Sequence, residues 1–393
     1  MKKIIKAVLF LIVIVVSGIL IFEYSYKLTL DNFITDRTTF IYSNKNINKE
    51  KLEKFENIFE IDKPIEKDIL KRIKNICILS QSKLYSSDIK IVGIADAGIY
   101  YPIMYMKMKN YFNLKEDNFY ELKEEYKKEL KIPEVDNIYV KIYRGLFFVS
   151  SDTVSIDRIL DNRGKKSLKT IEILNQNANE GLGTFVINQE RERLFGIDRV
   201  VVSGNIEDNK ILLDGYIYGD NEILKDLSNQ PEKRMMNKYI TDNRLYISTA
   251  SIKKLDTFIL RAISCKTTDT KKIDLIQELF LRGFADIISE LNGEIVVDLE
   301  NENYLLGLKS SKDAEIFMEY FKNDENINIQ KDIYGNIYIL IGGDTFDPSN
   351  NVEEIKENQF LLGKINTYYG KIEVNGFYDP DRLRIKTQIN IEK

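Results

Sequence analysis

Two Asp-Thr pairs are the first candidates for chemistry in this chain. Asp152 and Thr153 follow the apolar segment LFFVSS, and Asp344 and Thr345 follow YILIGG. Carboxylates at the ends of two strands suit general acid and base catalysis or, with Asp347 nearby, the binding of calcium. No complete metal-loop spacing surrounds them. We therefore interpret Asp152 as a helix cap and Asp344 as the start of an Asx-type turn.

Asp96 and Glu300 form a second pair of acids, each ending a strand before a turn, and we interpret both as solvated turn acids. Histidine is absent, which removes the usual general base near neutral pH, the Ser-His and Cys-His nucleophile pairs and nearly all zinc sites. The chain also has no nucleophile elbow, P-loop or dinucleotide fingerprint. The sequence thus predicts no catalytic residue, no metal, no cofactor and no enzymatic activity.

Met104, Met106 and Met108, three of only seven methionines, alternate in a segment that we predict to be a strand over residues 100–111. Side chains at i, i+2 and i+4 of a strand share one face, and methionine makes such a face soft and adaptable. These residues are our candidates for a groove that holds an acyl chain or an apolar peptide. The alternative is that they pack in the core beneath a helix.

The two cysteines, Cys77 and Cys265, can form one disulfide in an exported protein, or both can be buried thiols. Cys77 follows Ile69, Leu70 and Ile73 at helical spacing. This spacing places Cys77 on the apolar face of a predicted helix.

An uncharged run of 16 residues, from 7 to 22, predicts a helix that spans the cytoplasmic membrane once. Such a helix is about 24 Å long, and Ile4 and Ile5 can extend it toward the hydrocarbon thickness of about 30 Å. Lys2, Lys3 and Lys6 precede the run, which orients the N-terminus inside and the rest of the chain outside the cytoplasm. The predicted anchor consists of Ala7, Val8, Leu9, Phe10, Leu11, Ile12, Val13, Ile14, Val15, Val16, Ile19, Leu20, Ile21 and Phe22.

A cleaved signal peptide is the alternative, because Val15-Val16-Ser17 or Val16-Ser17-Gly18 suits a signal peptidase. The four apolar residues after Gly18 favour an uncleaved anchor. A lipoprotein is excluded because no cysteine lies near this run. A prepilin is excluded because its apolar helix would follow the glycine.

The rest of the chain is long enough to bury a sizeable core, since the protein has 393 residues, of which 44% are hydrophobic and 30% charged. Without the three N-terminal lysines, 54 basic residues stand against 61 acidic ones, a net charge of −7 for the exported part. We therefore expect no nucleic-acid partner, and direct binding to anionic headgroups is disfavoured. The charged run KEEYKKELK, residues 123–131, is interpreted as a solvated helix face.

Four segments recur in the same order, which predicts an internal duplication. GNIEDNKILLDGYI from Gly204 aligns with GFYDPDRLRIKTQI from Gly376, and both are typical of hairpins. The other pairs of matching segments begin at Leu146 and Tyr338, at Ile91 and Ile295, and at Phe40 and Leu245. The offset between the copies decreases along the chain from 205 to 172. We predict an anchor and juxtamembrane segment over 1–30, a first repeat over 31–235 and a second over 236–393.

Each copy is predicted to be an α+β fold with mostly antiparallel strands, because hairpin-length connections dominate. A short strand (39–43; 245–249) leads into an amphipathic helix and then a second helix, which is clearest over 274–291. Two strands follow (89–96 and 100–111; 293–300 and 304–310). A charged helix, two more strands (138–143 and 146–150; 327–331 and 337–341) and a hairpin complete each copy.

This pattern resembles the uncharacterised bacterial envelope proteins that carry a membrane-anchored domain of unknown function. The resemblance rests on the apolar N-terminal helix, the duplicated ectodomain, and strands such as GLFFVSSD followed by a helix with TVSIDRIL. It covers most of the chain after residue 35 and implies location and architecture only.

We expect a non-catalytic, single-pass, membrane-anchored protein with a binding or structural role in the cell envelope. Its partners would be the membrane, through the N-terminal helix, and another envelope protein. Two alternatives stay open: a carrier or sensor of an apolar ligand, lipid or peptide, and a carboxylate-based enzyme. The sequence leaves the oligomeric state open.

Overall fold

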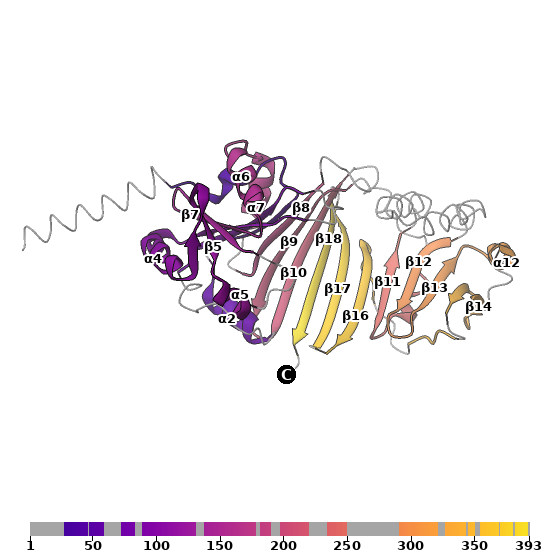
Figure 1. Cartoon of the computed structure of the whole chain (residues 1–393). Coiled ribbons are helices and arrows are strands. Elements are labelled where there is room, and N and C mark those ends of the chain that lie inside the picture. Colours follow the sequence, from indigo (N-terminus) through magenta and orange to yellow (C-terminus); the bar gives the residue numbers. More distant parts are fainter. Residues whose placement is uncertain are drawn as a thin grey trace, which may run out of the picture. The chain divides into compact units, whose positions relative to one another are not determined.

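The protein forms two compact units in the computed structural model (Figure 1). Unit 1 comprises residues 1–188 with 203–206, and unit 2 comprises 189–202 with 207–393. The residues that the structure describes are 27–45, 47–58, 72–82, 89–130, 137–177, 181–189, 197–219, 234–249, 291–320, 327–342, 345–349, 354–368, 370–379 and 382–391. The predicted anchor, Cys265, Asp344 and all but the last residue of the helix predicted over 274–291 lie outside these ranges; Leu291 is the first residue of a strand. Within them, no helix has the length and apolar character needed to cross a membrane.

Unit 1 contains an antiparallel sheet in the order β8-β1-β2-β3-β7-β6-β5-β4. Its strands are β1 (Phe40–Lys45), β2 (Asn75–Ser80), β3 (Val92–Asp96), β4 (Phe112–Leu114), β5 (Phe119–Leu122), β6 (Tyr139–Tyr143), β7 (Leu146–Ser150) and β8 (Gly183–Asn188). Ile41 pairs with Leu79 on one side and Val186 on the other, and all three are fully buried. These alternating apolar positions make one face of the sheet the core of unit 1.

Short helices complete unit 1. They are η2 (Leu30–Phe33), α2 (Lys49–Ile58), η3 (Gly98–Tyr100), α4 (Tyr101–Tyr111), η4 (Glu116–Asn118), α5 (Glu124–Leu130), α6 (Thr153–Asp161) and α7 (Leu168–Gln176). Asp152 caps α6, because its Oδ1 accepts a hydrogen bond of 2.8 Å from the Ser155 backbone N–H. The interpretation of Asp152 as a helix cap is confirmed.

Unit 2 contains a longer antiparallel sheet in the order β9-β10-β18-β17-β16-β11-β12-β13-β15-β14. Its strands are the first part of β9 (Ile197–Glu207), β10 (Lys210–Gly219), β11 (Arg244–Ser248), β12 (Leu291–Asp298), β13 (Asn303–Leu308), β14 (Ile327–Lys331), β15 (Ile337–Ile341), β16 (Gln359–Thr367), β17 (Gly370–Asp379) and β18 (Arg382–Ile391). Two helices are described, η6 (Asn237–Tyr239) and α12 (Ser311–Tyr320). The main core cluster lies under β11, β12, β13 and β15 and includes Tyr246, Val296, Leu305 and Tyr338.

The predicted mixture of helices with mostly antiparallel strands is confirmed, but two predicted elements of unit 1 are wrong. Residues 101–111 form α4 rather than a strand, because Pro102 fits the first turn of a helix and lacks the N–H that a strand ladder needs. Residues 75–80 form β2 rather than a helix. The run of Ile76, Cys77 and Ile78 suits a strand that lies between two others, here β1 and β3.

The methionines are therefore not on one face. Met104 and Met108 are four residues apart on α4 and pack against the cluster of Ala97, Val140 and Phe147, whereas Met106 is 62% exposed. A groove lined by all three side chains is ruled out by this geometry. The alternative, core packing beneath a helix, holds for Met108. The helix above this part of the core is α4, which carries the methionines itself.

Candidate functional site

The most distinctive surface of unit 2 is an apolar sheet face formed by β9, β10, β18, β17 and β16. The strand registers place Ile211, Ile389, Ile372 and Ile365 in one row and Ile217, Leu383 and Tyr378 in another. We call this surface the apolar face; its remaining large side chains are Val202, Leu213, Ile385, Val374 and Leu361. Thr387, Gly215, Gly363 and Gly376 are its other members. On β10, β16, β17 and β18, none of the positions on this face carries a charged side chain.

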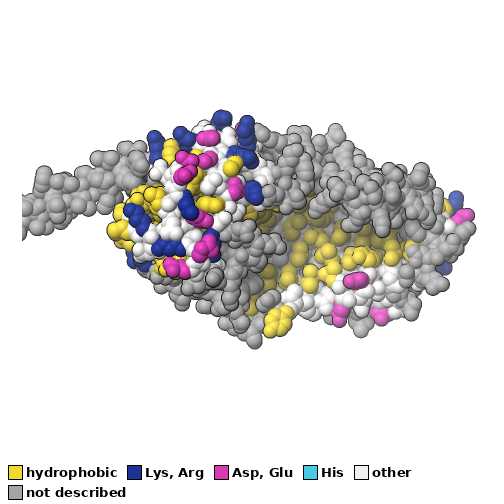
Figure 2. Space-filling model, in the orientation of Figure 1, with side chains coloured by type: hydrophobic (Ala, Val, Ile, Leu, Met, Phe, Trp, Pro, Cys, Tyr) yellow, Lys and Arg dark blue, Asp and Glu magenta, His cyan; other side chains and the backbone are white. Residues whose placement is uncertain are grey.

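The apolar face is not fully covered. Val374 and Ile385 lie on the two central strands, β17 and β18, yet both side chains are half-buried rather than buried. Ile389, Ile372 and Leu361 are also half-buried. Figure 2 shows hydrophobic side chains gathered in a hollow over these strands. Central positions of a sheet are the first to be buried when a layer packs on it, so the face remains accessible over its middle.

One end of the apolar face is closed by a small cluster. Tyr378, Leu383, Ile217 and Phe360 pack together, with the Phe360 and Tyr378 rings 4.6 Å apart between centroids. Gly376 lies beneath Phe360, and a Cβ at this position would come within 2.7 Å of the ring. Glycine is therefore required where the Phe360 ring crosses the strand.

The opposite face of the same strands is polar, as the alternation of strand side chains requires. Arg384 makes a two-pronged ion pair with Asp214 at 2.9 and 2.5 Å, and this carboxylate raises the pKa of Arg384. The Arg382 guanidinium lies 4.2 Å from the centroid of the Tyr216 ring. These contacts pair the charged groups of the polar face with one another and with aromatic rings.

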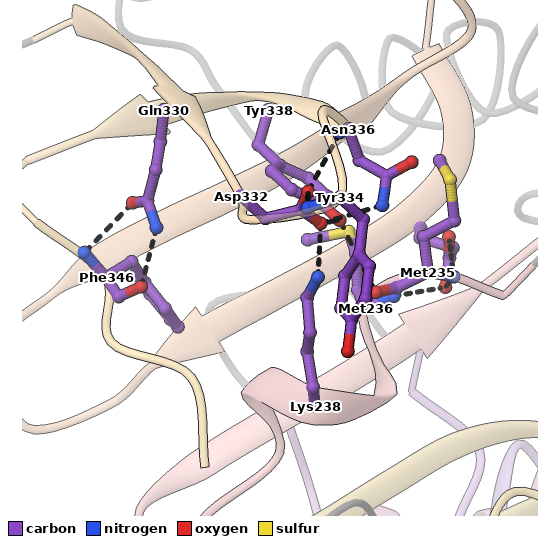
Figure 3. A network of polar contacts seen from close by, with 10 residues as sticks. Met235, Met236, Lys238, Gln330, Asp332, Tyr334, Asn336, Tyr338 and Phe346 are labelled. Atoms are coloured by element: carbon purple, nitrogen blue, oxygen red, sulfur yellow. Dashed lines mark hydrogen bonds and ion pairs between the residues drawn. The ribbon is translucent and has the colours of Figure 1, made fainter. Parts of the chain in front are cut away.

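A network of polar contacts joins η6 to the turn between β14 and β15 (Figure 3). Asp332 is paired with Lys238 and accepts hydrogen bonds from the Tyr334 N–H (2.8 Å), the Asn336 side chain (2.7 Å) and the Tyr338 hydroxyl (2.9 Å). Burial alone would raise the pKa of Asp332, but these donors hold it well below its usual range. Both carboxylate oxygens of Asp332 are occupied, so Asp332 is better suited to holding the two elements together than to accepting a proton.

Glu294 on β12 makes a second set of structural contacts. Its carboxylate is fully buried and accepts hydrogen bonds from the Met235 N–H at 2.9 Å, the Met236 N–H at 3.1 Å and the Tyr246 hydroxyl at 3.1 Å. Burial raises the pKa of Glu294, and the backbone donors partly oppose that rise. Glu294 thus ties residues 235–236 to the sheet.

Ionisable groups also converge in unit 1, around a cavity of about 280 Å³. Asp96 lies 2.6 Å from the Lys27 ammonium, and its oxygens also accept hydrogen bonds from the Gly98 N–H (2.7 Å) and the Asn75 side chain (3.0 Å). On the same cavity, the Asp31 carboxylate lies 3.0 Å from the ammonium of Lys45. The cavity therefore collects two acids, each already paired with a lysine.

Three further predictions from the sequence concern Glu300, Asp96 and Cys77. Glu300 is exposed and accepts a hydrogen bond of 3.0 Å from Asn243, as expected of a turn acid. Asp96 is not a solvated turn acid, because it is buried beside Lys27. Cys77 is a fully buried free thiol on β2, and burial raises its pKa. Over the described ranges, no group of acidic and cysteine side chains has an arrangement that could hold a metal ion.

The sequence analysis did not predict the apolar face, although it recognised the hairpins that begin at Gly204 and Gly376. ILLDGYI and KIEVNGFYD each place apolar residues at alternate positions, which was the available signal. The sequence does not reveal that β10 pairs with β18. Gly215 and Ile385 are partners in this pairing but lie far apart in the chain.

Comparisons of this chain with protein-family models, curated proteins and solved structures found no match.

Proposed function

We propose that this is a non-catalytic, single-pass, membrane-anchored protein of the cell envelope whose exported part binds the acyl chain of a lipid on the apolar face. The observation that carries the proposal is the partial exposure of Val374 and Ile385 at the centre of a sheet face whose positions on β10, β16, β17 and β18 carry no charged side chain. Such a face is costly to leave in water and needs an apolar occupant.

The size of the face suits a chain-like ligand. Four strand spacings of about 4.8 Å and six residues of about 3.4 Å each give a surface of roughly 19 by 20 Å. Covering about 200 Å² of it would contribute on the order of 5 kcal/mol before the cost of association. Thr387, Thr367 and Tyr378 offer side-chain hydroxyls among mostly aliphatic side chains, so the ligand segment in contact should be largely apolar.

The sequence supports a location beside lipids. The uncharged run at 7–22, preceded by Lys2, Lys3 and Lys6, has the composition of a signal anchor with its N-terminus in the cytoplasm. An anchor of this kind keeps the apolar face near its ligand source.

We further propose that residues 31–235 and 236–393 are tandem repeats. Support comes from the strand orders: β8-β1-β2-β3-β7-β6 in unit 1 and β16-β11-β12-β13-β15-β14 in unit 2 run through the chain in the same relative sequence. In this matching β3 corresponds to β13, so the sequence alignment of Ile91 with Ile295, on β12, needs correction. The offset between the copies then no longer decreases steadily.

A short motif not used in the sequence comparison also supports duplication. Phe33-Ile34-Thr35-Asp36 recurs as Tyr239-Ile240-Thr241-Asp242, just before β1 and β11, respectively. Both copies end a 3₁₀ turn, and Ile34 and Ile240 have nearly the same backbone angles, φ −83° with ψ 106° and 110°. The aromatic and isoleucine side chains are buried in both units.

A second candidate, a carboxylate-based enzyme, is favoured by one observation, the shared cavity of Asp96 and Asp31. The ion pairs with Lys27 and Lys45 argue for a structural role instead. If Asp31→Asn abolished a cellular phenotype of the full-length protein without lowering its stability, the enzymatic alternative would gain support.

Lipid cross-linking tests the proposal. Cells that produce the full-length protein are fed a fatty acid with a diazirine in its chain, irradiated, and the cross-linked peptides are identified by mass spectrometry. We expect cross-links on β10, β17 and β18 as well as on residues 7–22, which serve as the internal control. Cross-links confined to the anchor would reject lipid as the occupant and leave a protein partner.

A further inference from the structure

An exposed apolar surface lies on the side of η3 and α4 that faces away from the core. Ile99 and Met106 are each 62% exposed, and Tyr100 and Ile103 are also exposed. Ile99, Ile103 and Met106 follow one another at spacings of four and three residues, so they share one side of the helical segment. We call these four residues the α4 surface. Figure 2 shows hydrophobic side chains gathered over α4, with Lys and Arg side chains near them.

α4 is held rigidly from behind. Met108 is buried with Ala97, Val140 and Phe147, and Met104 packs against the same cluster. The exposed residues are therefore displayed by a fixed element rather than by a mobile loop. A water-facing side of a helix usually carries polar residues, so this pattern indicates a surface that is covered in the functional state.

The local charge differs from that of the whole chain. Residues 97–114 contain Lys107 and Lys109 and no acidic residue, although 61 of the 393 residues are acidic. The Lys109 ammonium lies 4.4 Å from the centroid of the Tyr105 ring, and the Arg72 guanidinium lies 5.5 Å from that of Tyr100. Apolar side chains flanked by tyrosines and basic groups suit the headgroup region of a bilayer.

The α4 surface is also close to the predicted anchor along the chain. The apolar run ends at Phe22, and five residues later Lys27 is buried in an ion pair with Asp96. Asp96 in turn accepts a hydrogen bond from the Gly98 N–H, and Ile99 follows directly. Five residues span at most about 18 Å, so the point where the chain leaves the membrane lies within that distance of Lys27.

We infer that the α4 surface inserts into the headgroup and upper acyl region of the outer leaflet beside the anchor. This inference rests on the anchor in the proposed function. The contact would fix the orientation of unit 1 on the membrane. A protein partner is the less favoured occupant of the α4 surface, because the anchor itself brings lipid within reach of Lys27.

The absence of tryptophan makes a direct test simple, since any introduced tryptophan is the only one in the protein. Full-length Ile103→Trp is reconstituted into phosphatidylcholine–phosphatidylglycerol vesicles with lipids brominated near the headgroup end of the chain. Leu11→Trp reports on the anchor with lipids brominated deep in the chain. Leu168→Trp, at a position of α7 that is 75% exposed, is the control on the same unit.

We expect Ile103→Trp to lose most of its emission to the shallow quencher and to emit at shorter wavelength than Leu168→Trp, which should be unquenched. Quenching of Leu11→Trp without quenching of Ile103→Trp would overturn the membrane contact and leave the anchor intact. Quenching of Ile103→Trp alone would keep the contact and reject the anchor. Equal quenching of Ile103→Trp and Leu168→Trp would reject a specific contact.

Discussion

The Lys27 ammonium lies 2.6 Å from a carboxylate oxygen of Asp96, and both side chains are more than nine-tenths buried. The pair connects the first described residue after the apolar run to the end of β3. A buried ion pair stabilises little by comparison with an apolar pair, but loss of one partner leaves a charge in a poor solvent. The first described residue is therefore held in the core of unit 1 by an ion pair.

Removal of this carboxylate should destabilise the protein strongly. In Asp96→Asn the hydrogen bonds from Gly98 and Asn75 can be kept in part, but the buried Lys27 ammonium loses the carboxylate that lies 2.6 Å from it. We expect a loss of about 3–5 kcal/mol in denaturant unfolding of the full-length protein in non-ionic detergent. Asp157→Asn is the control, because Asp157 pairs with Lys141 at 2.7 Å but is 48% exposed, and it should cost no more than about 1 kcal/mol.

The cap of α6 can be tested by two substitutions at one position. Asp152→Asn keeps a side-chain oxygen for the Ser155 N–H and should change stability little, whereas Asp152→Ala should cost about 0.5–2 kcal/mol. Thermal unfolding of both variants measures the difference. Equal losses for Asn and Ala would mean that charge, rather than capping, is what Asp152 contributes.

Asp332 should make the protein sensitive to acid. Its folded-state pKa is lowered, so its contribution is complete above the unfolded-state pKa of about 3.9 and is lost as the pH falls below that value. Asp332→Asn should cost about 1.5–3 kcal/mol at neutral pH and flatten the decline in unfolding free energy below pH ~4. Glu315→Gln, on an exposed position of α12, controls for the loss of one carboxyl group. If the decline in unfolding free energy below pH ~4 were unchanged in Asp332→Asn, the structural role of Asp332 would be contradicted.

Cys77 should be unreactive in the native protein. Its thiol is fully buried and its pKa is raised, mainly by burial, so little thiolate is present near neutral pH. Iodoacetamide should leave Cys77 unmodified in the folded protein and alkylate it after denaturation, as read by peptide mass spectrometry. Rapid alkylation of Cys77 in the native protein would show that β2 opens and would contradict the burial of this thiol.

Elements with strong local signals were predictable from the sequence. β7 (Leu146–Ser150) and β15 (Ile337–Ile341) have the predicted bounds, because each is a continuous apolar run ended by polar or glycine residues. Asp152 was recognisable as a cap because it precedes TVSIDRIL, whose apolar residues follow helical spacing.

The methionine segment was predicted wrongly because its pattern fits both the periodicity of a strand and that of a helix. Met104, Met106 and Met108 alternate like strand residues, but Met104 and Met108 are also one helical turn apart, and Pro102 decided in favour of a helix. Asp96 looked like a turn acid because its partner Lys27 lies 69 residues earlier. The apolar face needed the pairing of β10 with β18, which no local pattern contains.

The central claim is that the apolar face holds lipid, and two neighbouring residues of β17 test it most directly. Val374 lies on the apolar face and Asn375 on the polar face, and both are half-buried. The measurement is the yield of diazirine–lipid cross-links on β18, divided by the yield on residues 7–22, in full-length Val374→Asp and Asn375→Asp. Both variants are first checked for unchanged unfolding in denaturant.

A carboxylate in the path of an acyl chain should cost at least about 1.4 kcal/mol of binding, which is a tenfold loss. We therefore expect the normalised yield to fall tenfold or more in Val374→Asp and to stay within about twofold of the original in Asn375→Asp. Equal yields in the two variants, with both proteins folded, would contradict lipid binding on the apolar face.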